Sequence, residues 1–338
     1  MLQLVVRRHS QSVAKWSRTL ALLSSFLLSG PPLAHALDQA LPPYRPKPGV
    51  GGVLKAVGSD TMNSAATALA REFTAKYPEV KIEIEGNGSD TAPRALLDGT
   101  AQFGLMSRPM TSQELNAFEK AYGYRLGRIR VAVDALLIFV NKENPVRCLS
   151  LPQIDRIFSA TRQASGGRSL EDWGNLGLAG EWAGRRIALF GRNAASGTYA
   201  FFKGQVLYGG DYKAALTQLP TAAAVVDAVA ADKAAIGYGG LGRVTPAIRA
   251  VPLSVYEGGQ CFDASAEAVL SDKYPLARYL YVYTNKKPDE PLDPLRAEFA
   301  RFVLSKDGQS IVAAAGFYPV SNAEREADLE ALGIGPAN

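Results

Sequence analysis

Short apolar segments that end in polar turns recur at the start of the folded region of this chain. Three of them cover residues 53–57, 80–84 and 102–106, and they end in the turns 58–61 (Gly-Ser-Asp-Thr), 86–91 (Gly-Asn-Gly-Ser-Asp-Thr) and 107–109 (Ser-Arg-Pro). Apolar residues at helical spacing follow the first turn, and Thr111 with Glu114 forms a capping box after the third. This alternation of strands and helices predicts an α/β fold with a parallel sheet.

A second set of strand and helix patterns follows residue 150. Helices are expected over 150–158, from 199 onward and over 222–231, and strands over 186–190 and 235–238. The apolar run 131–140 is expected to cross between two lobes, and a strand over 279–283 to return to the first. We therefore expect a discontinuous lobe I (51–135 and 255–338), an inserted lobe II (136–254) and a Pro-rich linker (37–50) before them.

The first 36 residues have the features of a secretory signal peptide. Four basic residues come first, Arg7, Arg8, Lys15 and Arg18. An apolar run over residues 20–28 follows, and Ala-His-Ala at 34–36 is a small-x-small cleavage signal. The run is shorter than the roughly 20 apolar residues that span a bilayer. We expect cleavage near Ala36 and a periplasmic or secreted protein, with an uncleaved anchor as the alternative.

The composition of the remaining chain argues against most catalytic and polymer-binding classes. Both histidines, His9 and His35, lie in the first 36 residues, so the mature chain has no histidine-based triad and no histidine-ligated metal site. It carries 33 basic and 32 acidic side chains. That balance predicts no binding to nucleic acid or to a membrane surface. We expect no catalytic residue, no metal and no cofactor.

The chain has two cysteines, Cys148 and Cys261, too few for a thiolate metal cage. In an exported protein, two cysteines are able to form one disulfide, and we expect that bridge. Two separate buried thiols are the alternative.

Polar residues at the ends of the predicted strands indicate a site for a small anion. Ligands of parallel α/β sheets bind beyond the carboxyl ends of the strands, where a helix N-terminus offers N–H groups and a partial positive charge. Taken singly, Ser59, Thr61 and Ser89 are also explained as helix caps, and Arg108 as a partner in a salt bridge to Asp60 or Asp90. The strongest signal is Arg192, which precedes Ser-Gly-Thr at 196–198 by four residues. A guanidinium there can grip an oxyanion through two parallel hydrogen bonds.

In order and spacing, these turns are similar to those of the phosphate-binding proteins of phosphate ABC transporters. Further likeness appears at residues 235–238, 274–281 and 306–309, and the resemblance covers nearly all of 53–320. It implies the type II periplasmic binding fold, in which two lobes, each a mixed sheet flanked by helices, are joined by a two-strand hinge. It also implies a monomer that captures inorganic phosphate by hinge closure and delivers it to the permease subunits of an ABC transporter. The ligand-binding residues that we derive from the turns and the resemblance together are Ser59, Asp60, Thr61, Ser89, Asp90, Ser107, Arg108, Arg192, Ser196, Gly197 and Thr198.

Two positions depart from the family pattern. Some members carry an aspartate in the third turn that accepts the proton of phosphate, and Ser107-Arg108 stands there in this chain. Members often have an acid two residues after the arginine, where this chain has Ala194. Asp60 and Asp90 are then the candidate proton acceptors.

The alternatives to phosphate transport are sulfate, molybdate or tungstate binding, a phosphate-sensing or surface role, and a secreted phosphate-ester hydrolase. The histidine-free chain offers little to support the hydrolase.

Overall fold

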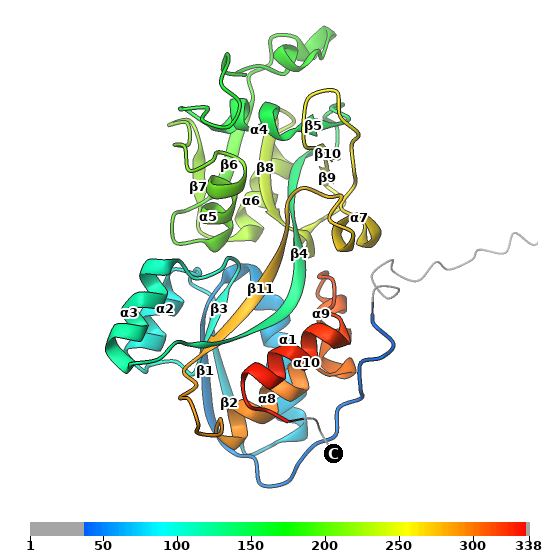
Figure 1. Cartoon of the computed structure of the whole chain (residues 1–338). Helices are drawn as coiled ribbons and strands as arrows, with labels where there is room; N and C mark the ends of the chain where they lie inside the picture. The colour runs from blue at the N-terminus through cyan, green and yellow to red at the C-terminus, as the bar shows by residue number, and fades with distance from the viewer. Residues whose placement is uncertain (1–36, 336–338) are drawn as a thin grey trace, which may run out of the picture. The chain divides into compact units, whose positions relative to one another are not determined.

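The computed structural model describes residues 37–335, which form a mixed α/β fold (Figure 1). The expected signal peptide, residues 1–36, lies outside the described residues. Within the described range, no helix has both the length and the apolar character needed to cross a membrane.

Among the described residues, nine strands form one sheet in the order β2-β1-β3-β11-β4-β8-β6-β7, with β9 paired to β4. Their bounds are β1 (Gly52–Gly58), β2 (Val80–Glu85), β3 (Phe103–Met106), β4 (Gly127–Asn141), β6 (Ala188–Arg192), β7 (Thr217–Leu219), β8 (Ala235–Gly240), β9 (Ile248–Ala250) and β11 (Ala277–Thr284). The short strands β5 (Leu149–Ser150) and β10 (Leu253–Ser254) pair in a separate sheet.

The strand directions divide the large sheet into two parallel groups. β1 runs parallel to β2 and β3, and β6 runs parallel to β7 and β8. Between the groups, β4 and β11 are antiparallel to each other and to their outer neighbours. β4 pairs with β11 through residues 127–135 and with β8 through 136–140, so one uninterrupted strand belongs to both groups (Figure 1). The parallel pairs are as predicted, and the two central strands make the sheet mixed.

Helices connect and cover the strands. They are α1 (Asn63–Lys76), α2 (Thr91–Leu97), α3 (Ser112–Tyr122), α4 (Leu151–Phe158), α5 (Gly197–Gln205), α6 (Ala222–Ala231), α7 (Ala266–Leu270), α8 (Pro294–Val303), α9 (Lys306–Ala314) and α10 (Asn322–Ala331). Short 3₁₀ turns include η2 (Asp60–Met62), η3 (Trp173–Leu176), η4 (Gly180–Trp182) and η5 (Leu241–Arg243). The capping box predicted at Thr111 begins α3, and Ser150 with Gln153 forms a second box at the start of α4; each has both reciprocal hydrogen bonds.

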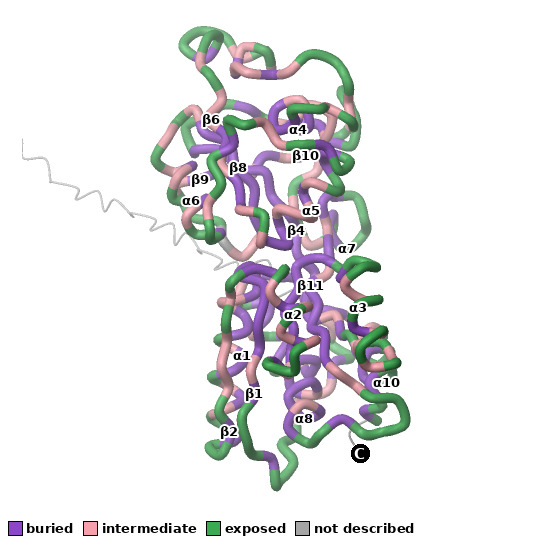
Figure 2. Tube along the Cα trace, turned by 90° about the vertical axis from the view of Figure 1, so that its left-hand side faces the viewer, coloured by how far each residue is buried: buried purple, intermediate pink, exposed green. Residues whose placement is uncertain are grey.

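Buried apolar side chains form two main clusters. Figure 2 marks the buried residues along the Cα trace. The first cluster contains residues between 133 and 276 together with Tyr318, and the second contains residues of 50–132 and 280–334. A smaller cluster lies under α2 and α3. Each parallel group of strands therefore has its own core, and the chain leaves the second cluster and returns to it.

The Pro-rich segment 37–50 packs against the C-terminal helices. Leu41 is buried, and the carbonyl of Pro42 accepts a hydrogen bond from the N–H of Lys306 at 2.8 Å. The hydroxyl of Tyr44 donates to Glu298 at 2.7 Å. These contacts hold the segment against α8 and the start of α9.

Cys148 and Cys261 form a disulfide with a Cα–Cα distance of 6.2 Å. The bond joins segments beside β5 and β10, which pair at Leu149 and Leu253. The alternative of two separate thiols is therefore wrong.

Candidate functional site

Three serines meet at the carboxyl ends of β1, β2 and β3. The hydroxyl of Ser59 donates to that of Ser107 at 3.1 Å, and the hydroxyls of Ser89 and Ser107 lie 3.2 Å apart. The N–H of Ser107 also donates to the hydroxyl of Ser89 at 3.1 Å. All three side chains are buried. They come together because β1 lies between β2 and β3 in parallel register, so the turns that end the three strands share one edge of the sheet.

Gly58 allows the first turn to lie this close to its neighbour. Its φ is +141°, and a Cβ at this position would lie 2.1 Å from the carbonyl oxygen of Leu105. That carbonyl instead accepts the N–H of Ser59 at 2.8 Å. The serine is thus held over the sheet edge, and its side chain makes no capping bond to η2.

The start of α5 faces the serine cluster from the other group of strands. Ser196 caps α5 by accepting the N–H of Thr198 at 3.2 Å. A Cβ at Gly197 would lie 2.3 Å from the hydroxyl of Ser89 and 2.8 Å from that of Ser107. The backbone of α5 therefore approaches the serines as closely as a residue without a side chain permits.

Two further contacts join the same two groups of elements. The hydroxyls of Thr61, on η2, and Thr198, on α5, lie 2.9 Å apart. The N–H of Asp90 donates to the carbonyl of Ala195 at 3.2 Å. The structure thus brings hydroxyl groups and the N-terminus of a helix together at one buried position. Hydroxyl groups and the N–H groups of a helix N-terminus are hydrogen-bond donors for an oxyanion.

Arg192, the last residue of β6, pairs with Asp60, the residue that follows Ser59. Its Nη1 is 3.1 Å from Oδ2 of Asp60, and its Nη2 donates to the carbonyl of Pro220 at 2.8 Å. The N–H of Ala222, the first residue of α6, also donates to Oδ2 of Asp60, at 2.9 Å. Arg192 and Asp60 are 1% and 7% exposed. Asp60 therefore supplies the carboxylate partner that Ala194 does not.

Arg108 and Asp90 face each other, as the salt-bridge alternative predicted. Nη2 of Arg108 donates to Oδ1 of Asp90 at 2.6 Å. The same guanidinium grips Glu114 with two bonds, of 2.8 and 2.7 Å. Glu114 was predicted only as part of a helix cap, and it also binds Arg108.

Acid is expected to weaken this network. Burial acts to raise the pKa of Glu114, but hydrogen bonds from Arg108 and Thr111 outweigh it and lower the pKa below its usual 4.5. A carboxyl whose pKa is lowered on folding stabilises the folded state above its unfolded pKa, and this stabilisation is lost as pH falls through the folded pKa. Glu114→Gln is therefore expected to lower the melting temperature at neutral pH by a few degrees, about 1 kcal/mol, and the deficit should shrink below pH 4.5.

Thermal unfolding at several pH values tests this expectation, with Glu119→Gln as the control. Glu119 lies on the same helix, and its ion pair with Arg125 is exposed. A deficit of Glu114→Gln that is constant from neutral to acidic pH would contradict the assignment.

A second buried arginine, which the sequence patterns did not indicate as part of the site, lies beside the cluster. Arg278, on β11, donates through Nη2 to the hydroxyl of Thr198 at 2.9 Å and to Oδ2 of Asp134 at 2.7 Å. Asp134, on β4, accepts the N–H of Leu241 at 3.0 Å through its other oxygen. The available signal was a single charge inside an apolar strand, at Asp134 within the run 131–140, because a buried charge requires a partner.

Comparison with known proteins places the chain in a family. The sequence profile of the PBP superfamily domain matches residues 37–307. The phosphate-binding protein PstS of Pseudomonas aeruginosa is 45% identical over 299 residues, which cover 88% of this chain and 93% of that protein. The chain belongs to the PstS family of phosphate-binding proteins.

Solved structures of similar proteins share the PstS-family fold. A putative phosphate ABC transporter substrate-binding protein from Clostridium perfringens, with bound phosphate, matches with a TM-score of 0.66 at 24% identity, covering 80% of this chain and all of that one. A possible phosphate binding protein from Planctomyces limnophilus matches with a TM-score of 0.61 at 26% identity, over 84% and 99% of the two chains. Membership of the PstS family confirms the resemblance and the expectation of a binding protein rather than an enzyme.

Proposed function

We propose that this chain captures inorganic phosphate between two lobes and delivers it to an ABC permease. The observation that carries the proposal is the convergence of the serine cluster, the start of α5 and the Arg192–Asp60 pair on one buried position. The proposal takes the ligand from the PstS proteins, whose name describes phosphate binding. Export after cleavage near Ala36 and action as a monomer belong to the same proposal.

The two lobes of the proposal are residues 51–135 with 255–338, and residues 136–254. The two apolar clusters support two lobes, because each belongs to one group of parallel strands. The buried apolar residues of 268–276, which this division counts in the first lobe, pack in the cluster of β6 and β8. β4 and β11 are the two-strand hinge, since they are the strands that lie between the groups. In this reading, Thr61–Thr198 and Asp60–Arg192 are contacts that form when the lobes close.

Binding then follows from donors that converge on closing. The serine hydroxyls, the hydroxyl of Thr61 and the guanidinium of Arg192 replace the water molecules that phosphate loses. The N-terminus of α5 adds backbone N–H groups and its partial positive charge. Each bond to the charged ligand contributes roughly 1.5–3 kcal/mol, so donors that arrive only in the closed state favour closure.

We assign the proton of phosphate to Asp60. Asp90 is the other candidate, but Arg108 binds its carboxylate, and its side chain is 45% exposed. Asp60 is buried beside Arg192, and its contacts to Arg192 and Ala222 both fall on Oδ2. Its Oδ1 is then the acceptor for a ligand hydroxyl. Sulfate at neutral pH has no proton to donate, so an acceptor at this position disfavours it.

Calorimetry on the mature chain, stripped of ligand by unfolding and refolding, tests the proposal. Phosphate is expected to bind with one-to-one stoichiometry, and sulfate and molybdate more weakly. Asp60→Asn is expected to narrow the preference for phosphate over sulfate by about tenfold or more, because an amide can donate to sulfate. If another oxyanion binds and phosphate does not, the proposed ligand is wrong, while the fold assignment is unaffected.

A further inference from the structure

Arg278 stands where the two central strands and the start of α5 meet. In the register of β11 and β4, Arg278 pairs directly with Asp134. Its guanidinium binds Asp134 through Nε, at 3.0 Å, and through Nη2, and it lies 5.1 Å from the ring centre of Phe201 on α5. The side chains of Arg278 and Asp134 are 2% and 0% exposed. The guanidinium is therefore held by side chains of β4 and of α5.

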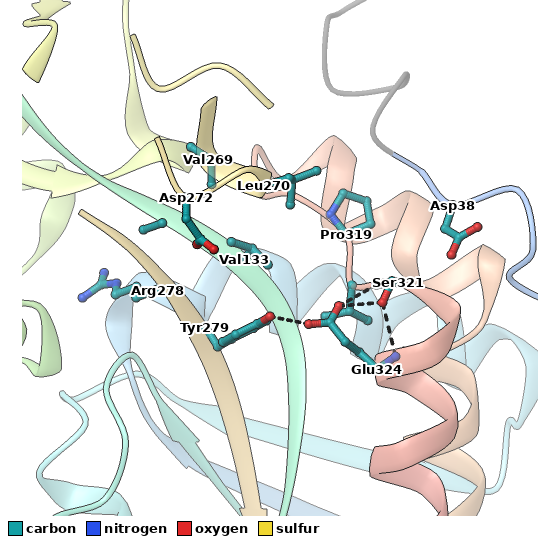
Figure 3. A pocket seen from close by; sticks show the side chains of 12 residues that line it. Asp38, Val133, Val269, Leu270, Asp272, Arg278, Tyr279, Pro319, Ser321 and Glu324 are labelled. Atoms are coloured by element: carbon teal, nitrogen blue, oxygen red, sulfur yellow. Dashed lines mark hydrogen bonds between the residues drawn. The ribbon is translucent and has the colours of Figure 1, made fainter. Parts of the chain in front are cut away.

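A large pocket lies beside β11, and its lining includes Arg278. That pocket, of about 530 Å³, is also lined by Tyr279 and Glu324, which are joined by a hydrogen bond. Figure 3 shows the guanidinium of Arg278 pointing away from this pair. The alternation of side chains along a strand explains the difference, because Arg278 and Tyr279 leave opposite faces.

The bond from Arg278 constrains the hydroxyl of Thr198. An arginine only donates, so the Thr198 oxygen accepts from Arg278 and its own proton points elsewhere. The neighbouring hydroxyl is that of Thr61, at 2.9 Å. Of the two hydroxyl protons, one is used between the threonines and the other remains to be donated. The bond from Arg278 occupies an acceptor position of the Thr198 oxygen, so the threonine pair keeps one proton to donate to a third group and has less capacity to accept from it.

We propose that Arg278 is a positioning residue of the anion site, which acts through Thr198 and favours the dianion of phosphate over the monoanion. The inference rests on the proposed function, because it takes phosphate as the ligand. A hydroxyl pair polarised by a cation binds an unprotonated oxygen best and is poor at accepting a proton from the ligand. Nη1 of Arg278 is buried and makes no hydrogen bond within residues 37–335. The N–H groups of this atom therefore have no acceptor among the described protein groups.

The test is phosphate titration by calorimetry at pH values on either side of the second ionisation of phosphate, with the double variant Asp134→Asn/Arg278→Gln. Replacing both charges avoids an unpaired buried charge, and the asparagine oxygen keeps an acceptor for Leu241. The affinity of the double variant is expected to fall about tenfold where the dianion prevails and clearly less where the monoanion prevails. Arg278→Lys, which keeps the charge, is expected to lie between wild type and the double variant.

The matched control is Arg130→Gln/Asp328→Asn. This pair also joins β4 to a carboxylate, at 2.9 Å, but its hydrogen bonds go to α10 and not to either threonine. Its affinity for phosphate and its pH profile are expected to equal those of wild type. An equal loss of affinity at all pH values, in the double variant or in Arg278→Lys, would indicate a structural role and overturn the proposal. If wild type binds phosphate and both Arg278 variants bind as tightly, only this inference fails. If wild type binds no phosphate, the proposed function fails with it.

Discussion

Replacing Arg192 by methionine is expected to abolish measurable phosphate binding, with a loss of about 1000-fold or more, about 4 kcal/mol. Methionine keeps much of the volume but removes the only guanidinium that contacts Asp60 among the described residues. Among the groups of residues 37–335, it also leaves the buried Asp60 carboxylate with only the hydrogen bond from Ala222. An uncompensated buried carboxylate repels an anionic ligand as well as weakening the fold.

The loss of binding has to be separated from the loss of stability. Arg192→Met/Asp60→Asn removes both charges, so it is expected to recover much of the unfolding free energy while phosphate still fails to bind. Arg249→Met is the control, because Arg249 lies on β9 and its Nη2 donates to the carbonyls of Asn144 and Val146. Calorimetry and thermal unfolding of all three variants decide the matter. Phosphate binding by Arg192→Met within tenfold of wild type would remove Arg192 from the site.

Gly197→Ala is expected to weaken phosphate binding about 100-fold, while the unfolding temperature changes little. The added methyl group would lie 2.3 Å from the hydroxyl of Ser89 and 2.8 Å from both its Cβ and the hydroxyl of Ser107. If the hydroxyls of Ser89 and Ser107 rotate away from the methyl group, they no longer bind the ligand. If they keep their positions, α5 has to move away from the serine cluster. In the proposed two-lobed arrangement, either response opposes closure without disturbing the core of a lobe.

Gly204→Ala is the matched control for this substitution. Gly204 lies on the same helix, and a Cβ there meets no atom within 4 Å. Alanine in a helix interior is expected to stabilise the protein by roughly 0.5–1 kcal/mol and to leave phosphate affinity unchanged. If Gly197→Ala binds phosphate as tightly as Gly204→Ala does, the close approach of α5 to the serines is not needed for binding.

Much of the fold is visible in local sequence patterns. The boxes at Thr111 and Ser150 begin helices as expected, because a cap requires only residues three positions apart. The strands before the polar turns were also found from the alternation and length of apolar segments. The helix α10 was not predicted, since its residues 322–331 are mostly polar and alanine-rich and show only a weak apolar stripe.

The turns that form the site were predicted from the sequence, but the partners of its buried charges were not. The serines and Arg192 stand at strand ends, where the sequence analysis placed a ligand site. The partner of Arg192 was left open, and the structure brings Asp60 to it. Arg108 had two candidate partners, and the structure selects Asp90 and adds Glu114. In both cases the charged residue was identified from the sequence, and the tertiary structure determined which carboxylate it binds.

The sequence by itself determined the strand–helix units, the caps that begin the helices, and which turns carry anion-binding residues. These features depend on spacing over a few residues and on the chemistry of single side chains. Only the tertiary structure decided which buried charges meet. Arg278 reaches Thr198 across 80 positions and Asp134 across 144, because β11 returns beside β4 after the chain has formed the second group of strands. No local pattern encodes that return, since it results from strand pairing across the whole sheet.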